Sequence, residues 1–316
     1  ADSRVTSFIC SIVKSTLELG MIGELKGLDG MVFHSICDSA RNLAMVYRRN
    51  FPQPFVEYIH FPQNMVSQGS DEYLYHEFDR VRRNMEDFFG IKVSDEALGA
   101  SIALYNEKRA CLREIYRIRR EAPHLISATE TYILMRAGTL LPPEEHNEIL
   151  KEILASLPQR RTKPMDKVRV VIEGAFCEQI PIDLVQVLED AGCYVVDDDL
   201  IIGWRYFTED VPIDGNPLMA LAKSYNHKSH YSSTRHDWRR PRYQQLVERV
   251  RGSKAEAVVF CIAKFCEPAL FDYPLFKDAL ERENIPHILV EFEEKMWTFE
   301  RIRSEVETFV ESILFT

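Results

Sequence analysis

The sequence predicts an α/β protein made of two Rossmann- or flavodoxin-like domains, each with a parallel sheet and inserted helices. Three observations support this fold class. The chain has 316 residues, which is enough for about two domains. After residue 167, short apolar runs alternate with helical patterns, as they do in βαβ units. A polar stretch with two prolines, residues 158–166, separates the two halves and predicts the domain boundary.

The composition is that of an ordinary globular protein, with 46% hydrophobic and 28% charged residues. Acidic residues outnumber basic ones by 49 to 39, and the formal net charge of -10 opposes binding to polyphosphates. We therefore expect no nucleic acid partner, although a local basic pocket for a small phosphorylated ligand is compatible with this charge. The chain contains no run of about 18 apolar residues, so we also expect no membrane span.

The first domain is predicted over residues 1–157. A helix is expected over residues 2–26, where apolar residues recur at helical spacing, and a buried strand is expected over 29–36. A second helix follows, with Asp38 or Ser39 as its N-cap. The chain begins without a methionine and close to its first helix, so we expect that a front segment is missing.

The rest of the first domain is predicted to consist of one strand and a long helical insertion. The strand covers residues 55–61. The helices cover residues 71–89, 94–120, 127–137 and 143–157. The first two of these helices carry many Arg and Glu residues, and we expect their charged faces to be solvated.

The second domain is predicted over residues 167–316 and shows the clearer alternation of strands and helices. Its strands are expected at 168–174, 194–196, 257–263 and 287–291. Its helices are expected at 182–191, 270–281 and 298–313, with further helical pieces between residues 200 and 252. In such sheets, functional groups collect at the carboxyl ends of the strands.

The seven cysteines form an odd count in a chain of this size, which argues against a disulfide framework and indicates a reducing cytoplasm. No C-x-x-C pair is present, so the spacing indicates neither a zinc finger nor a ferredoxin-type site. Cys37, Cys177 and Cys266 each precede an acidic residue at a predicted strand-to-helix turn, where a thiolate is stabilised. An inert, buried thiol is the alternative for each of them.

Three motifs carry a resemblance to a known family. They are residues 32–39, residues 203–207 behind the acidic run 197–199, and residues 265–268 with 271–274. Together they resemble the family of 2-hydroxyacyl-CoA dehydratases and ATP-dependent benzoyl-CoA reductases, and the similarity covers nearly the whole chain. Within that family, residues 135–138 with 144–147, residues 174–179 and residues 193–199 look most like a catalytic subunit of benzoyl-CoA reductase.

The resemblance implies one 4Fe-4S cluster per chain, in the cleft between the two domains. Carried over by position, its ligands are Cys10, Cys37 and Cys266. Three thiolates leave one iron with an open coordination position. The resemblance also implies a related second catalytic subunit in a heterodimer, a separate pair of ATPase (electron-activator) subunits, ferredoxin as electron donor, and an aromatic acyl-CoA substrate held between the catalytic subunits.

Further residues are candidates for the chemistry of such a site. Cys177 and Glu178 could line the substrate pocket, with Glu178 as a proton donor; the alternative is a buried thiol beside a helix-start carboxylate. His34 is a candidate for a histidine relay. Many relatives have Pro and then His where this chain has His34 and Ser35, so the relay would be either shifted or absent.

The run of three acids from Asp197 to Asp199 requires positively charged partners, because adjacent carboxylates repel one another. Arg205 is the expected partner in a structural ion pair, and CoA binding is its competing role. The segment that follows forms a basic patch of His227, His230, Arg235, His236 and Arg239. One interpretation is that this patch, above all His227, His230 and Arg235, binds CoA phosphates or donates a proton. A solvated or subunit-facing loop is the alternative for this segment.

Four functions therefore stay open, in this order of preference. The first is a subunit of benzoyl-CoA reductase, which dearomatises its substrate to a cyclic dienoyl-CoA with two electrons. The second is a subunit of a 2-hydroxyacyl-CoA dehydratase, a radical lyase that recycles one electron. The third is a non-catalytic partner subunit of either complex. The fourth is a flavodoxin-like binding module without a cluster.

Overall fold

The structure is a computed structural model, and it describes residues 1–51, 54–174, 180–200, 207–228, 234–235, 237–293 and 296–315. The chain divides into two compact units, and each is described by itself. Unit 1 comprises Ala1–Ala103, Val211–Asp237 and Phe265–Pro268. Unit 2 comprises Leu104–Asp210, Trp238–Lys264 and Ala269–Thr316.

This division does not coincide with the domain boundary that the sequence predicts. The polar stretch 158–166 lies inside the stretch Leu104–Asp210 of unit 2. The assignment of residues 1–157 and 167–316 to two domains, with a cleft between them, stays a prediction.

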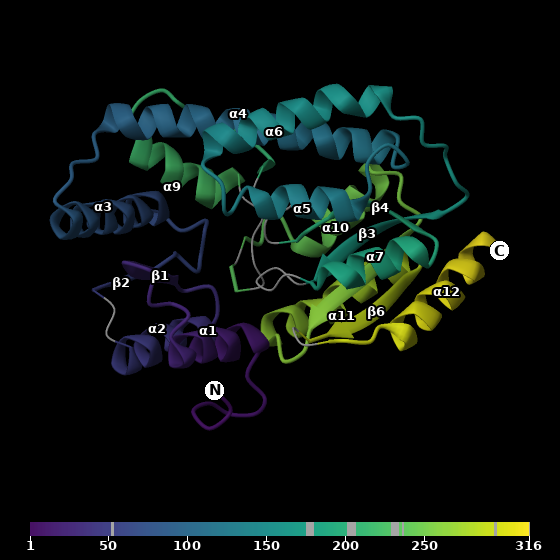
Figure 1. Cartoon of the computed structure of the whole chain (residues 1–316), viewed down its shortest axis with the longest axis horizontal. Helices are drawn as coiled ribbons and strands as arrows, with labels where there is room; N and C mark the ends of the chain where they lie inside the picture. Colours follow the sequence, from purple (N-terminus) through teal and green to yellow (C-terminus); the bar gives the residue numbers. More distant parts are fainter. Residues whose placement is uncertain are drawn as a thin grey trace. The chain divides into compact units, whose positions relative to one another are not determined.

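Unit 2 is built on a four-stranded parallel sheet with the strand order β4-β3-β5-β6 (Figure 1). Its strands are β3 (Val168–Gly174), β4 (Cys193–Asp198), β5 (Ala257–Ala263) and β6 (His287–Phe292). Every residue of β5 is buried and apolar, as is typical of an inner strand of a parallel sheet. The predicted parallel α/β architecture is confirmed for this unit.

The strand order of this sheet reverses direction between β3 and β5, because β3 leads to β4 on one side and β5 leads to β6 on the other. In open α/β sheets, ligands bind beside the carboxyl ends of the strands at such a switch point. β3 ends at Gly174, three residues before Cys177, and β5 ends at Ala263, three residues before Cys266. In the sequence, the predicted site residues Cys177 and Cys266 thus come shortly after β3 and β5, the two strands on either side of the switch point.

Helices flank this sheet and form a second apolar core beside it. α12 (Glu300–Leu314) contacts α7 (Ile182–Asp190) and the strands β3 and β6, and α10 (Arg242–Gly252) contacts β3. The second core is formed by α5 (Ala128–Ala137), α6 (Pro143–Ser156) and the part of α4 (Asp95–Glu121) that belongs to unit 2. Its buried residues include Leu112, Ile115, Tyr116, Met135, Leu150 and Phe207.

Unit 1 contains a two-stranded parallel sheet, in which β1 (Gly30–His34) pairs with β2 (Phe55–Ile59). Its helices are α1 (Ser11–Ile22), α2 (Asp38–Asn50), α3 (Ser70–Phe89), α9 (Pro217–Lys228) and the start of α4. α1 and α2 pack with β1 around a core that includes Cys10, Leu17, Phe33, Leu43 and Tyr47. α3 packs against α9, which comes from a distant part of the sequence.

The largest difference from the predicted elements concerns the first helix. The sequence predicts it over residues 2–26, whereas α1 covers only Ser11–Ile22. Cys10 has an extended backbone and begins the helix as its N-cap, and Gly23 ends it with φ 85°, a left-handed conformation that glycine adopts without strain. The apolar residues before Cys10 have the spacing typical of a helix, but they are not part of α1.

The ends of the remaining predicted helices and strands agree with the structure within about three residues. The largest of these differences is at α11 (Glu267–Arg282), which begins three residues before the predicted start at residue 270. α5 begins with a capping box, in which the Ser127 hydroxyl and the Glu130 carboxylate satisfy each other's backbone N–H groups. No helix within the part of the chain that the structure describes is long and apolar enough to cross a membrane.

Candidate functional site

The three cysteines predicted as cluster ligands all belong to unit 1, and each directly precedes a helix. Cys10 is the N-cap of α1, Cys37 is the N-cap of α2, and Cys266 precedes Glu267, the first residue of α11. The N–H groups of a first helical turn favour negative charge. All three thiols therefore lie at helix starts, where the N–H groups favour a negatively charged ligand.

The Cys37 thiol itself caps α2. Its Sγ accepts a hydrogen bond from the backbone N–H of Ala40 at 3.4 Å. The prediction that Asp38 or Ser39 is the cap is wrong, because the helix begins one residue earlier. Burial raises the pKa of Cys37 above its usual value, and the nearby Cys266 adds to this rise, although the hydrogen bond from Ala40 opposes it. Cys37 and Cys266 thus lie near each other although they are far apart in the sequence.

The backbone in front of Cys266 is strained. Phe265 has φ 63°, in the left-handed region that a bulky side chain rarely adopts. Such strain persists only where the surrounding structure enforces it, and it is common at functional sites. Cys266 itself is only 3% exposed. The strained turn thus places a buried thiol at the start of a helix.

The thiol groups of Cys10, Cys37 and Cys266 are the type of donor that holds an iron-sulfur cluster. Cys10 and Cys266 are buried, Cys37 is half-buried, and Cys10 packs in the same apolar core as Phe33 of β1 and Leu43 of α2. Among the residues that the structure describes, no three Cys, His, Asp or Glu side chains are grouped closely enough to hold a single metal ion. The cluster and its ligand set stay predictions.

Arg235 joins the two loops that follow β1 and β2. Its Nη1 donates to the carbonyl oxygen of Pro62 at 2.7 Å, and its Nη2 donates to that of Ser35 at 3.2 Å. Its guanidinium lies 5.1 Å from the centre of the Phe61 ring, a cation-π distance. The neighbouring Thr234 hydroxyl donates to the carbonyl oxygen of Ile36. Residues 234 and 235 therefore hold the loop that leads into Cys37.

His34 is the last residue of β1 and precedes this loop. Burial lowers the pKa of His34, and the positive charge of Arg235 lowers it further. A neutral imidazole at pH 7 can accept a proton, which is compatible with the predicted relay. The relay itself stays a prediction.

His227 lies at the end of α9 and binds Asp71 in the first turn of α3. Its Nε2 is 2.9 Å from Asp71 Oδ1, which also accepts a hydrogen bond from Asn226 Nδ2 at 2.8 Å. Burial alone would raise the pKa of Asp71, but the hydrogen bonds from Asn226 and His227 bring it below its usual value. In this structure His227 therefore fastens α9 to α3, and its predicted contact with substrate stays a prediction.

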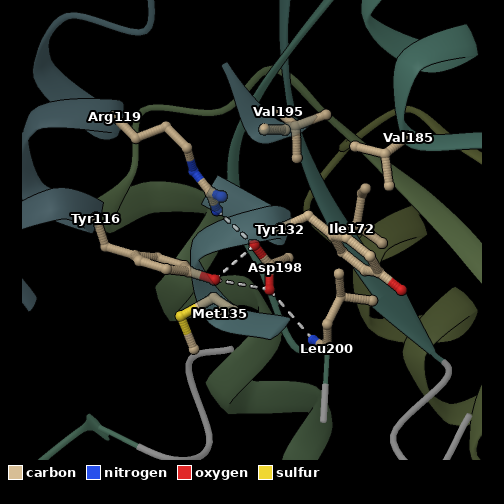
Figure 2. Close-up of a pocket in the computed structure, with 10 residues that line it drawn as sticks. Tyr116, Arg119, Tyr132, Met135, Ile172, Val185, Val195, Asp198 and Leu200 are labelled. Atoms are coloured by element: carbon tan, nitrogen blue, oxygen red, sulfur yellow. Dashed lines mark hydrogen bonds and ion pairs between the residues drawn. The ribbon is translucent and has the colours of Figure 1, made fainter. Parts of the chain in front are cut away.

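In unit 2, the predicted need of the acidic run for positive partners is met inside the core. The Tyr116 hydroxyl donates to Asp198 Oδ2 at 2.9 Å, and Arg119 Nη2 lies 2.5 Å from the same oxygen. Figure 2 shows both side chains directed at the Asp198 carboxylate. Burial and the Asp198 charge raise the pKa of Tyr116 well above its usual value, so the hydroxyl remains a donor. Arg119 is 1% exposed. The expectation that the charged face of this helix is solvated is therefore wrong at its carboxyl end.

The other two acids of the run meet further arginines. Asp197 lies 2.6 Å from Arg120 and 3.8 Å from Arg249. Asp199 accepts a hydrogen bond from the backbone N–H of Gly174 at 3.0 Å and lies 3.7 Å from Arg242. Asp197 thus meets arginines of both α4 and α10, whereas the side-chain partners of Asp198 described above, Tyr116 and Arg119, both come from α4.

Glu173 of β3 extends this network of buried charges. Its carboxylate lies 2.7 Å from Arg249 and 3.1 Å from Arg242, which also binds Asp272. Sequence reasoning missed the role of the arginines of α4 and α10. The available signal was the acidic run itself, because buried carboxylates require at least as many nearby cations or N–H donors.

The cavity next to Asp198 is too small for a substrate. It is lined by the residues that Figure 2 labels together with Ala128, and its volume is about 10 Å³. A volume of that size is at the lower limit for one water molecule. This small cavity beside Asp198 is therefore no ligand pocket, and the ion pair of Asp198 with Arg119 contributes to the fold.

Four predicted site residues lie outside the described residues. They are Cys177, Glu178, Arg205 and His230. Their predicted roles in catalysis and substrate binding stay predictions. The segments 175–179 and 201–206 contain three of them. The first follows Gly174, the last residue of β3, and the second begins three residues after Asp198, the last residue of the neighbouring strand β4.

Comparison with known proteins relates the whole chain to one group of enzymes. Residues 1–313 match the model of the family described as "2-hydroxyglutaryl-CoA dehydratase, D-component". One of the benzoyl-CoA reductase subunits of Thauera aromatica is 37% identical over 313 residues, which are 99% of this chain and 81% of the relative.

Dehydratase subunits are related more distantly. Lactoyl-CoA dehydratase subunit beta of Anaerotignum propionicum is 28% identical over 99% of this chain and 82% of the relative. (R)-2-hydroxyglutaryl-CoA dehydratase subunit beta of Acidaminococcus fermentans is 27% identical over 97% of this chain and 82% of the relative. The resemblance found in the sequence motifs is thus confirmed over the full length of the chain.

Proposed function

The chain belongs to the 2-hydroxyglutaryl-CoA dehydratase D-component family, and we propose that it is a subunit of an ATP-dependent benzoyl-CoA reductase. The complex would transfer low-potential electrons to the aromatic ring of a CoA thioester and form a cyclic dienoyl-CoA. One observation carries this choice within the family. The identity to a benzoyl-CoA reductase subunit is 37%, against 27–28% for the dehydratase subunits named above.

Cys10, Cys37 and Cys266 would hold a 4Fe-4S cluster, which supplies one-electron chemistry at low potential. The proposal rests on their shared unit, their burial and their positions before three helices. The apolar core around Cys10 keeps water from this part of the unit, and burial is one of the factors that set the potential of such a cluster.

The chain's own residues would position these donors and move protons. Arg235 and Thr234 hold the loop between His34 and Cys37, so the thiol that caps α2 keeps a fixed place. His34, kept neutral by burial and by Arg235, is available to accept a proton. We assign proton delivery to Glu178, because it follows β3 at the switch point of the sheet in unit 2.

The names of the relatives, each described as a subunit, support partner subunits for this chain. On the resemblance of the sequence motifs, we propose as partners a related second catalytic subunit, an ATPase pair that activates electrons, and ferredoxin as their source. The cluster and substrate would lie in the cytoplasm, where thiols stay reduced.

The second candidate is a subunit of a 2-hydroxyacyl-CoA dehydratase, and the family description together with the dehydratase relatives favours it. An anaerobic assay of the native complex with benzoyl-CoA and with a 2-hydroxyacyl-CoA separates the two. ATP-coupled electron consumption in proportion to benzoyl-CoA turnover supports the reductase. Turnover of the hydroxyacyl-CoA with only catalytic amounts of electrons would replace it by the dehydratase.

A further inference from the structure

Tyr58 of β2 lies on the face of the two-stranded sheet that α1 and α2 cover. In a parallel pair of strands, residues in register point to the same face of the sheet. Tyr58 is in register with Phe33 of β1. Phe33 belongs to the apolar core that also contains Cys10 and Leu43, and Tyr58 packs against that core. The tyrosine side chain therefore extends from the sheet toward the two helices that begin at Cys10 and Cys37.

The Tyr58 hydroxyl lies near the start of α2. Burial raises the pKa of this hydroxyl above its usual value, the positive charges of Arg41 and Arg235 oppose the rise, and Cys37 adds to it. A charge shifts a pKa when it lies nearby. Cys37 is the N-cap of α2, Arg41 follows it by four residues, and Arg235 binds the loop in front of it. All three groups thus place the tyrosine hydroxyl beside the first turn of this helix.

The oxygen of this hydroxyl is buried. The Ser35 hydroxyl lies close enough to lower the pKa of Tyr58, but its oxygen already accepts a hydrogen bond from the backbone N–H of Phe61 at 2.9 Å. Within the part of the chain that the structure describes, the Tyr58 oxygen has no hydrogen-bond partner of normal length and angle. Burying a hydroxyl without such a partner is unfavourable, and a native structure that does so often uses the group for a ligand or for chemistry.

We propose that Tyr58 is a positioning residue whose hydroxyl donates a hydrogen bond to the Cys37 sulfur when this sulfur is a cluster ligand. This role rests on the proposed function, because it requires Cys37 to bind the cluster. The backbone N–H of Ala40 already donates to the same sulfur at 3.4 Å. Hydrogen bonds to ligand sulfurs stabilise negative charge on them and so favour the reduced form. Tyr58 would therefore raise the reduction potential of the cluster.

The test is a redox titration, monitored by electron paramagnetic resonance, of the anaerobically purified full chain with its cluster. The variant is Tyr58→Phe, which removes only the hydroxyl group. The matched control is Tyr73→Phe, because Tyr73 belongs to the same unit but is exposed on α3. Iron and acid-labile sulfide are counted in all three proteins, so that a lost cluster is distinguished from a changed potential.

We expect equal iron contents in the three proteins and a more negative midpoint potential in Tyr58→Phe alone. Loss of one hydrogen bond should change the equilibrium between oxidised and reduced cluster by about tenfold, which is about 59 mV for a one-electron couple. In electron–nuclear double resonance of the reduced cluster, Tyr58→Phe should also lack an exchangeable proton coupling that the wild type and the control show.

An unchanged potential in Tyr58→Phe with full iron content would overturn the proposed hydrogen bond, and so would an equal shift in Tyr73→Phe. Loss of iron in Tyr58→Phe would overturn it as well, because a group that only tunes the potential is not needed to retain the cluster.

The outcome is distinguishable from a failure of the proposed function. If the wild type contains no iron, the assignment of the cluster ligands fails, and the role of Tyr58 fails with it. If the wild type contains iron and Tyr58→Phe keeps the same potential, only the role of Tyr58 fails. If the complex proves to be a dehydratase, the expected shift is the same, because the same cluster is proposed for both functions.

Discussion

At the carboxyl end of β4, three consecutive carboxylates are buried, and each is matched by a guanidinium at ion-pair distance. At the carboxyl end of β1, a histidine, a serine and a cysteine stand close together in the sequence, and the arginine beside them binds carbonyl oxygens. Both places are strand ends of parallel sheets, where functional groups usually collect. Only their side-chain chemistry distinguishes them.

The difference shows that a run of charged residues at a strand end is not by itself a functional site. The acids at the end of β4 meet cations from α4 and α10, and a cavity that Asp198 lines has a volume of only about 10 Å³. The loop after β1 leads instead to a thiol at a helix start, which can exchange its proton for a metal ion. We therefore expect stability to depend on β4 and chemistry to depend on the loop after β1.

The largest effect on stability is expected from Asp198→Asn. The variant leaves Arg119 buried without its countercharge, which typically costs about 3–5 kcal/mol of the free energy of unfolding. Urea denaturation of the variant and the wild type measures this difference. The control is Asp210→Asn, since Asp210 pairs with Arg113 in a half-exposed position and should cost at most about 1 kcal/mol. Equal costs in both variants would contradict the structural role of the β4 acids.

A smaller effect, confined to unit 1, is expected from Arg235→Met. It removes the hydrogen bonds to Ser35 and Pro62, which should cost about 1.5–3 kcal/mol in total, and Arg235→Lys should restore part of the loss. Hydrogen exchange should increase in the loops 35–37 and 60–62. The control is Arg41→Met, because Arg41 is exposed. Unchanged exchange in these loops would show that Arg235 does not hold them.

The sequence predicts these two regions unequally. The parallel strands of unit 2 are identified closely because buried strands read as apolar runs between helical patterns, and Ala257–Ala263 is matched residue by residue. Cys37 is identified as a helix-start residue for the same local reason. The clamp by Arg235 could not be predicted, because it joins segments 200 residues apart. The burial of Arg119 depends in the same way on a distant strand.

The smallest effect is expected at the link between α3 and α9. The pKa of Asp71 lies below its usual value, so the ionised carboxylate contributes stability above the pH at which an unfolded Asp titrates, about 3.9, and that contribution is lost as pH falls through the lower folded pKa. Asp71→Asn should therefore destabilise the chain by about 1 kcal/mol at pH 7 and by less below pH 4.

Urea denaturation at pH 7 and below pH 4 tests this prediction. Asp87→Asn serves as the control, because Asp87 is exposed on the same helix and should show no such dependence. A difference between Asp71→Asn and the wild type that stays constant over this pH range would rule out the proposed linkage.

The most direct test of the functional assignment is a count of iron and acid-labile sulfide in anaerobically purified protein. The wild type is compared with Cys266→Ala and with Cys193→Ala, whose thiol is equally buried but belongs to unit 2. We predict about four iron and four sulfide per chain in the wild type and in Cys193→Ala, and a loss of both in Cys266→Ala while the fold is retained. An iron-free wild type, or full iron in Cys266→Ala, would contradict the assignment of Cys10, Cys37 and Cys266 as cluster ligands.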